Sequence, residues 1–167
     1  MKRRLFNQTV LRSLFLSVVG SSILGVRPRQ AQAGTVFRQA EETGAATVYR
    51  DPACGCCHQW VDYLKGQGFQ VTDYVREDMA AVKRELGVPS SMESCHTAVI
   101  DGYVIEGHVP AEDIRRLLRE RPAAVGIAVP GMPVGTPGME MSDRKDNFSV
   151  VLFTQNGQTT DFNRYEF

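Results

Sequence analysis

The chain has 167 residues, with 19 lysine or arginine residues balanced by 19 aspartate or glutamate residues. Six of the basic residues and none of the acidic ones fall within residues 1–33, so the other 134 residues carry 13 basic against 19 acidic side chains, a formal charge of −6. This negative charge argues against nucleic acid and anionic membrane surfaces as partners. A chain of this length is sufficient for one domain with its own hydrophobic core.

Residues 1–33 are predicted to form a cleaved signal peptide. Lysine and arginine residues open the segment, an apolar run follows at Leu14–Val26, and Ala31-Gln32-Ala33 is typical of a cleavage site. The apolar run is too short to cross a membrane as a helix. Arg3-Arg4-Leu5-Phe6 also fits a twin-arginine signal, so that route and the general secretory route both stay open. We therefore expect an exported, periplasmic protein without membrane attachment after cleavage.

Two β-α units are predicted in the next part of the chain. Residues 34–46 are polar and contain glycine, which indicates a flexible arm. A β-rich run at 46–49 and loosely alternating apolar residues at 69–75 indicate strands. Apolar residues at helical spacing predict helices over residues 58–65 and 78–86.

A β-hairpin and a third helix are predicted to follow. Thr97–Ile100 and Tyr103–Ile105 are apolar strands joined by the turn signal Asp101-Gly102. Pro110 stands where a helix should begin, and that helix ends before Pro122. The resulting order β-α-β-α-β-β-α, with a cysteine motif between the first strand and the first helix, predicts an α/β fold of the thioredoxin-like type.

The C-terminal segment has a different character. Residues 130–141 contain too much proline and glycine for a helix or a central strand. Asn156-Gly157 is a strong turn signal between predicted strands at 148–153 and 159–162, so we expect an appended C-terminal β-hairpin. We assign residues 47–167 to one metal-binding domain, which includes the loop and hairpin of residues 130–167.

Four cysteines are the candidates for chemistry: Cys54, Cys56, Cys57 and Cys95. In an exported protein an even number of cysteines usually indicates disulfides. Here three of them fall within four positions, where disulfides would close loops too small to stabilise the fold much. A loop that opens into a helix favours thiolates, because exposed N–H groups and the helix dipole stabilise negative charge. Thiolates attack disulfides and bind soft metals, so both chemistries stay open at this point.

Cys95 is expected to join the other three cysteines in space. In thioredoxin-like domains the loop before the third strand passes over the C-x-x-C motif, and a cis-proline usually occupies it. Laying Val99-Ile100-Asp101-Gly102 on the corresponding strand and turn puts Cys95 and His96 in that loop. Folding would then bring a fourth sulfur within reach of the other three.

Four thiolates suit Cu(I), Zn(II) or an iron–sulfur cluster. Adjacent Cys56 and Cys57 are awkward for wrapping one zinc ion, but they suit bridging of several Cu(I) ions, since one thiolate can bind two metals. We therefore expect more than one Cu(I) ion, with zinc less favoured. Further metal ligands are predicted among three residues with nitrogen or thioether donors: His96, Met132 and Met139. His108 is expected to organise a turn, and His58 to point away from the cysteines.

The chain resembles the periplasmic copper-resistance family of the CopG type, whose members were long described only as a domain of unknown function. The resemblance lies in Tyr49–Cys57, Ser94–Ala98, Glu106–Ala111 and Val129–Pro133, and extends from about Thr47 to Met141. It implies a thioredoxin-like fold and a cysteine-bridged copper cluster whose ligands fall on the same four cysteines. Storage, delivery and redox interconversion of Cu(I) and Cu(II) are all compatible with the resemblance.

Three functions therefore stay open, and with them whether the protein is an enzyme. The favoured one is copper binding for resistance or handling, with copper ions and other envelope copper proteins as partners. The second is an envelope thiol–disulfide oxidoreductase with Cys54 as nucleophile and Cys57 as resolving thiol. The third is a domain that a structural zinc ion or disulfides merely stabilise.

Overall fold

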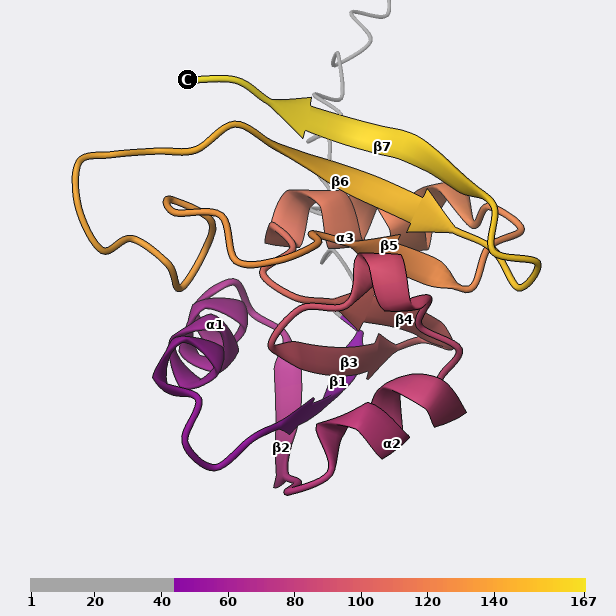
Figure 1. Cartoon of the computed structure of the whole chain (residues 1–167), viewed down its shortest axis with the longest axis horizontal. Helices are drawn as coiled ribbons and strands as arrows, with labels where there is room; N and C mark the ends of the chain where they lie inside the picture. Colours follow the sequence, from indigo (N-terminus) through magenta and orange to yellow (C-terminus); the bar gives the residue numbers. More distant parts are fainter. Residues whose placement is uncertain (1–43) are drawn as a thin grey trace, which may run out of the picture. The chain divides into compact units, whose positions relative to one another are not determined.

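The computed structural model describes residues 44–167, so the predicted signal peptide and most of the predicted arm lie outside the described residues. Seven strands, three α-helices and one short 3-10 helix form the described part. In chain order the elements are β1 (Ala45–Arg50), α1 (Gly55–Gly66), β2 (Gln70–Val75), α2 (Met79–Glu85), η1 (Ser90–Met92), β3 (His96–Ile100), β4 (Tyr103–Glu106), α3 (Ala111–Glu120), β5 (Gly126–Ala128), β6 (Phe148–Phe153) and β7 (Thr159–Tyr165) (Figure 1).

All the described strands form one mixed sheet in the order β2-β1-β3-β4-β5-β6-β7 (Figure 1). Strand β1 runs parallel to β2 and antiparallel to β3, and β4 pairs antiparallel with β3. The predicted α/β class and the order β-α-β-α-β-β-α are confirmed. The assignment to the thioredoxin-like type stays a prediction.

Apolar clusters lie on both faces of the sheet. The larger one packs Trp60 of α1 and Ile114 of α3 against the strands, and the smaller one includes Leu86 at the end of α2. Val104 and Ile105 are neighbours in β4 but belong to different clusters, and side chains alternate between the two faces of a strand. Thus α1 and α3 cover one face and α2 the other. Within residues 44–167 no helix has the length and apolar character needed to cross a bilayer.

The C-terminal hairpin belongs to the same sheet. Strand β5, which was not predicted from the sequence, pairs parallel with β4 and antiparallel with β6, and so connects the hairpin to the first four strands. Gly126 permits this pairing because a Cβ there would lie 1.8 Å from the carbonyl oxygen of Val104. Strand β6 has the predicted bounds, and β7 extends to Tyr165, beyond the predicted end at Phe162.

Candidate metal centre

Three cysteines lie at the N-terminus of α1. The helix begins at Gly55, three residues before the predicted start, so Cys54 is its N-cap and Cys56 and Cys57 lie in its first turn. Cys54 and Cys57 form a disulfide, while Cys56 is a free thiol whose Sγ lies 3.6 Å from Cys54 Sγ. Cys57 is fully buried, whereas Cys54 and Cys56 are partly exposed.

Cys95 lies immediately before β3 and faces this trio. Strand β3 is antiparallel to β1, and the register pairs His96 with Arg50 at the end of β1 from which the cysteine loop departs. The sulfur atoms of Cys54, Cys56, Cys57 and Cys95 consequently all lie within 4.8 Å of one another. The prediction that folding brings the distant cysteine to the other three is confirmed. Four soft donors in one place suit a soft or borderline metal ion.

A buried ion pair holds the loop that carries Cys95. The Glu106 carboxylate is fully buried and accepts hydrogen bonds from the Ser94 backbone N–H at 2.6 Å and from the Thr97 hydroxyl at 2.6 Å. Lys83 of α2 contacts the same carboxylate at 2.5 Å. Burial raises the pKa of Glu106, while Lys83, Thr97 and Ser94 act in the opposite direction. The position of the fourth sulfur thus depends on a hydrogen-bonded polar network in the core.

Two histidines also contact Cys95. His96 Nδ1 lies 3.2 Å and His108 Nε2 lies 3.1 Å from Cys95 Sγ, and both side chains are buried. The other ring nitrogen of His108, Nδ1, lies 2.7 Å from the carbonyl oxygen of Pro137. The expectation that His108 organises a turn was therefore incomplete: it does tie down the Pro/Gly-rich loop, but its second nitrogen faces the cysteine cluster.

A signal for His108 was present in the sequence. The Asp101-Gly102 turn pairs Ile100 with Tyr103, and the same register pairs Thr97 with Glu106. Continued two residues further, this register puts Cys95 opposite His108. A predicted hairpin with a two-residue turn would have been enough to place them side by side.

The Pro/Gly-rich loop packs onto the first turn of α1. A Cβ at Gly138 would lie 2.8 Å from the backbone nitrogen of Trp60 and 3.1 Å from the carbonyl oxygen of Cys56. In this loop Met139 is buried and Met132 is more than half exposed. Their role as metal ligands stays a prediction. His58 is exposed and its Nε2 lies 3.5 Å from Asp62 Oδ2, as expected for a residue that points away from the cysteines.

The Cys95 thiol holds its proton tightly in the absence of a cation. Burial, with a further contribution from Cys56, raises the pKa of the Cys95 thiol to about 12. Burial also lowers the pKa of His108 and lowers that of His96 well below its ordinary range. Both imidazoles are therefore neutral, and neither supplies the positive charge that would stabilise a thiolate. A metal ion would supply that charge and displace the thiol proton.

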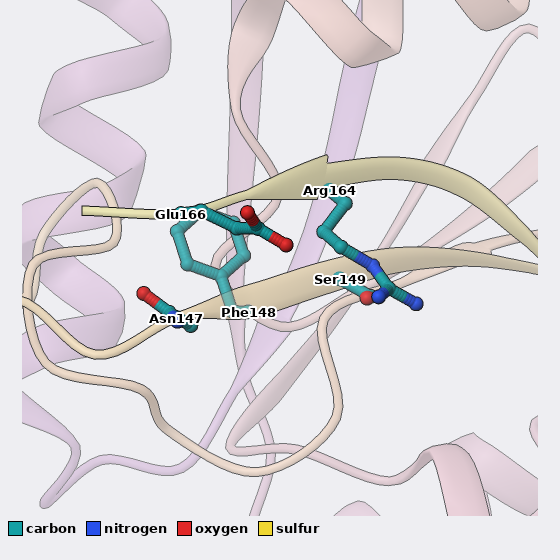
Figure 2. A pocket seen from close by; sticks show the side chains of 5 residues that line it. All are labelled: Asn147, Phe148, Ser149, Arg164 and Glu166. Carbon is teal, nitrogen blue, oxygen red and sulfur yellow. The ribbon is translucent and has the colours of Figure 1, made fainter.

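A concave region outside the cysteine cluster carries no soft donors. It lies between the start of β6 and the end of β7 and is lined by Asn147, Phe148, Ser149, Arg164 and Glu166 (Figure 2). None of these residues is a cysteine, histidine or methionine, so this region offers none of the soft donors found at the cysteine cluster.

Comparison with known proteins gives consistent relatives. A family model described as "Protein of unknown function, DUF411" matches residues 92–139. The solved structure "Copper resistance protein copG- Form 2" is 57% identical, with a TM-score of 0.71, and the match covers 75% of this chain and 100% of that one. "Copper resistance protein copG- Form 1" is 58% identical, with a TM-score of 0.70 and coverage of 74% and 98%. No curated protein matches the chain.

Proposed function

Because the chain belongs to the CopG-type copper-resistance family, we propose that it is an exported copper-handling protein that holds Cu(I) between Cys54, Cys56, Cys57 and Cys95. The observation that carries this proposal is the convergence of four sulfur atoms within 4.8 Å of one another. Thiolate sulfur is the donor that selects Cu(I) among the copper oxidation states. The name of the two solved relatives supports copper as the metal.

The arrangement of the sulfurs supports more than one copper ion. Cys56 and Cys57 are consecutive in the first turn of α1, so they reach the cluster from different directions around the helix. Two such thiolates suit bridging between ions, since one thiolate can bind two metals, and the remaining sulfurs would join those ions into one cluster. Four sulfurs within 4.8 Å of one another would also fit a single zinc ion, but consecutive cysteines are awkward for wrapping one ion. Zinc is therefore the less favoured metal.

Loading of the site requires reduction of the Cys54–Cys57 disulfide. Both sulfurs are bonded to each other in the structure, and only thiolates bind copper strongly. A dithiol reductant supplies the two electrons, is itself oxidised to a disulfide, and leaves two thiols that release their protons as Cu(I) binds. The redox state of this pair thus controls how much copper the protein holds. A protein whose thiols bind copper when reduced and release it when oxidised suits the redox handling of copper in the periplasm.

A second function is supported by the same disulfide. A C-x-x-C disulfide at a helix N-terminus is the arrangement of thiol–disulfide oxidoreductases. Cys54 is partly exposed and Cys57 is buried, which suits Cys54 as the sulfur that substrate thiols reach and Cys57 as the resolving thiol. Under this function Cys56 and Cys95 have no role in exchange.

Four single cysteine-to-serine variants distinguish the two functions. The reduced protein without its signal peptide is titrated with Cu(I) anaerobically, and bound copper and thiols are counted on the same sample. We expect each variant to hold less copper than the wild type, and the exposed His58→Ala control to hold the same amount. If the protein is an oxidoreductase, Cys54→Ser should lose disulfide exchange, whereas Cys56→Ser and Cys95→Ser should keep it. The variants would then show no common loss of bound copper.

A further inference from the structure

We propose that a single dissociable proton, bound by Asp113 and linked through Tyr165 to Glu112, holds the end of the C-terminal hairpin on α3. We call these three side chains the Tyr165 cluster. Helix α3 supplies the two carboxyl groups and β7 supplies the phenol. The hairpin is held while the proton is bound and is released when the proton is lost to water. This inference concerns the hairpin and does not depend on the proposed function.

The geometry of the Tyr165 cluster requires one hydrogen more than the phenol has. Tyr165 Oη lies 2.5 Å from Glu112 Oε1 and 2.7 Å from Asp113 Oδ2. Both are hydrogen-bond distances. A phenol has one hydrogen to donate, and an ionised carboxylate can only accept. One of the two contacts must therefore use a hydrogen that belongs to a carboxyl group.

Burial assigns this hydrogen to Asp113. Asp113 is 2% exposed, whereas Glu112 is exposed to water. Water stabilises the charged form of a carboxyl group, so the exposed group is the one that stays ionised. The Asp113 carboxyl then donates to Tyr165, and Tyr165 donates to the Glu112 carboxylate. The other oxygen of Asp113, Oδ1, accepts from the side-chain amide of Asn163 at 2.9 Å, so both of its oxygens have partners in β7.

The charged groups around the Tyr165 cluster leave this proton in place. Arg116 of α3 pairs with Glu120 at 2.8 Å. Arg164 of β7 pairs with Asp161 at 2.6 Å. Each of these cations thus has a carboxylate partner outside the cluster. The charge of Arg116 lowers the pKa of Asp113, but this influence is weaker than that of burial.

The ionisation of the groups agrees with the assignment. Burial is the largest influence on Asp113 and raises its pKa, and the charge of Glu112 raises it further. Hydrogen bonds from Tyr165 and Asn163 oppose this change, but Tyr165 cannot donate to Asp113 while its one hydrogen is on Glu112. Burial and the two carboxyl groups raise the pKa of Tyr165, so the phenol is neutral. Burial and the Glu112 charge also raise the pKa of Tyr63 in α1.

The Tyr165 cluster acts on both strands of the hairpin. Tyr165 ends β7, and its ring stacks at 4.5 Å on Phe148, the first residue of β6. These strand ends also border the concave region shown in Figure 2. When Asp113 loses its proton, two carboxylates face one phenol hydrogen, and the buried one loses a partner. Release of Tyr165 from α3 admits water to the Asp113 carboxylate and separates it from its partners in β7.

The test is hydrogen exchange along the hairpin of the copper-free, oxidised protein over a series of pH values. Division by the intrinsic exchange rate at each pH gives the protection of each backbone amide. Above pH 3.8 the released form has lost the Asp113 proton, while the held form keeps it up to the raised pKa. We therefore expect the protection of amides at the Tyr165 end of β7 to fall by up to about tenfold per pH unit over this range.

Three variants complete the test, and circular dichroism shows that each is folded. Asp113→Asn carries an amide that can donate to Tyr165 at every pH, so its protection should not change over this range. Tyr165→Phe lacks the hydroxyl and should lose most of the protection that the wild type has at low pH. The control Asp161→Asn removes an exposed carboxylate of β7 and should keep the pH dependence of the wild type.

A direct measurement is the pH titration of the Asp113 carboxyl carbon by carbon-13 NMR. Titration at or below pH 3.8 would overturn the inference, because Asp113 would then be ionised beside Glu112 while the contacts are intact. The same pH dependence of protection in the wild type and in Asp113→Asn would also overturn it. None of these measurements involves copper, so failure here leaves the proposed function intact, and failure of the cysteine variants to lose copper leaves this inference intact.

Discussion

Replacement of Gly107 by alanine should destabilise the protein more than replacement of a matched glycine. Gly107 lies between Glu106 and His108 with φ at +74°, and its N–H donates to the His96 carbonyl at 2.9 Å. A Cβ there would lie 2.5 Å from Ser94 Oγ and 2.7 Å from the Val129 carbonyl oxygen. Backbone is one of the clashing groups, so the side chains cannot relieve the contact alone.

The control is Gly87→Ala. Gly87 follows α2 with φ at +73°, and a Cβ there would meet nothing within 4 Å. The left-handed conformation costs an alanine about 1–2 kcal/mol at either position, and the change in the entropy of the unfolded chain cancels between the two variants. The clash at Gly107 adds about 1–3 kcal/mol. We therefore expect losses of about 1–2 kcal/mol for Gly87→Ala and about 2–5 kcal/mol for Gly107→Ala.

Urea unfolding of the oxidised, copper-free variants measures both free energies of unfolding. Under the proposed function Gly107→Ala should also lower copper binding, because the substitution displaces Ser94 and the neighbouring Cys95, while Gly87→Ala should not. Equal losses of stability in the two variants would refute the reasoning about the close contact.

Three more predictions follow from buried groups and from the disulfide. Lys83→Met should lower the free energy of unfolding in urea by about 3–5 kcal/mol, because the Glu106 carboxylate is left buried without its cation. The double variant Lys83→Met, Glu106→Leu should recover most of this loss. Absence of recovery would contradict the argument that the two charges are partners. Burial raises the pKa of Asp113 above 3.8, so the folded state binds this proton more tightly than the unfolded chain does. The stability that this group contributes is therefore present below pH 3.8 and is lost as the pH rises through the raised pKa. Asp113→Asn should flatten the fall in thermal stability over that range, and an unchanged pH profile would contradict the assignment. Cu(I) should raise the melting temperature of the reduced protein, because a free copper concentration of 100 Kd adds about 2.7 kcal/mol to its stability. The melting temperature of the protein with the Cys54–Cys57 disulfide should stay nearly unchanged. Equal shifts in the two forms would show that the two sulfurs are not ligands.

Local patterns were sufficient for most of the elements. The strands and helices of the first part of the domain were predicted with errors of a few residues at their ends, because alternation and helical spacing of apolar residues depend on neighbours in sequence. Asp78 caps α2, with its side chain accepting from the Ala81 backbone N–H at 2.9 Å. Strand β5 was missed because it has only three residues, one of them glycine, and is a strand solely through its pairing with β4 and β6.

The candidate site likewise contains residues that could be predicted from the sequence and residues that could not. The four cysteines and His96 were found from residue type and spacing, and the convergence of Cys95 on the other three was predicted from the order of the elements. The role of His108 was not predicted, since its nitrogen meets Cys95 only through the pairing of β3 with β4. Its turn-like sequence suggested another role. The network of Lys83 and Glu106 was also missed, because the two residues approach each other from α2 and β4 and only the folded core makes their charges partners.

The amino-acid sequence by itself determined the donors: which atoms are soft, how closely three of them follow one another, and where a helix would begin beside them. The tertiary structure decided which donors meet. Sheet register set the separation between Cys95 and His108, and burial kept the imidazoles neutral and the Cys95 thiol protonated. The physical reason is that donor type is a property of single residues, whereas distance and desolvation arise only when segments far apart in the chain pack together.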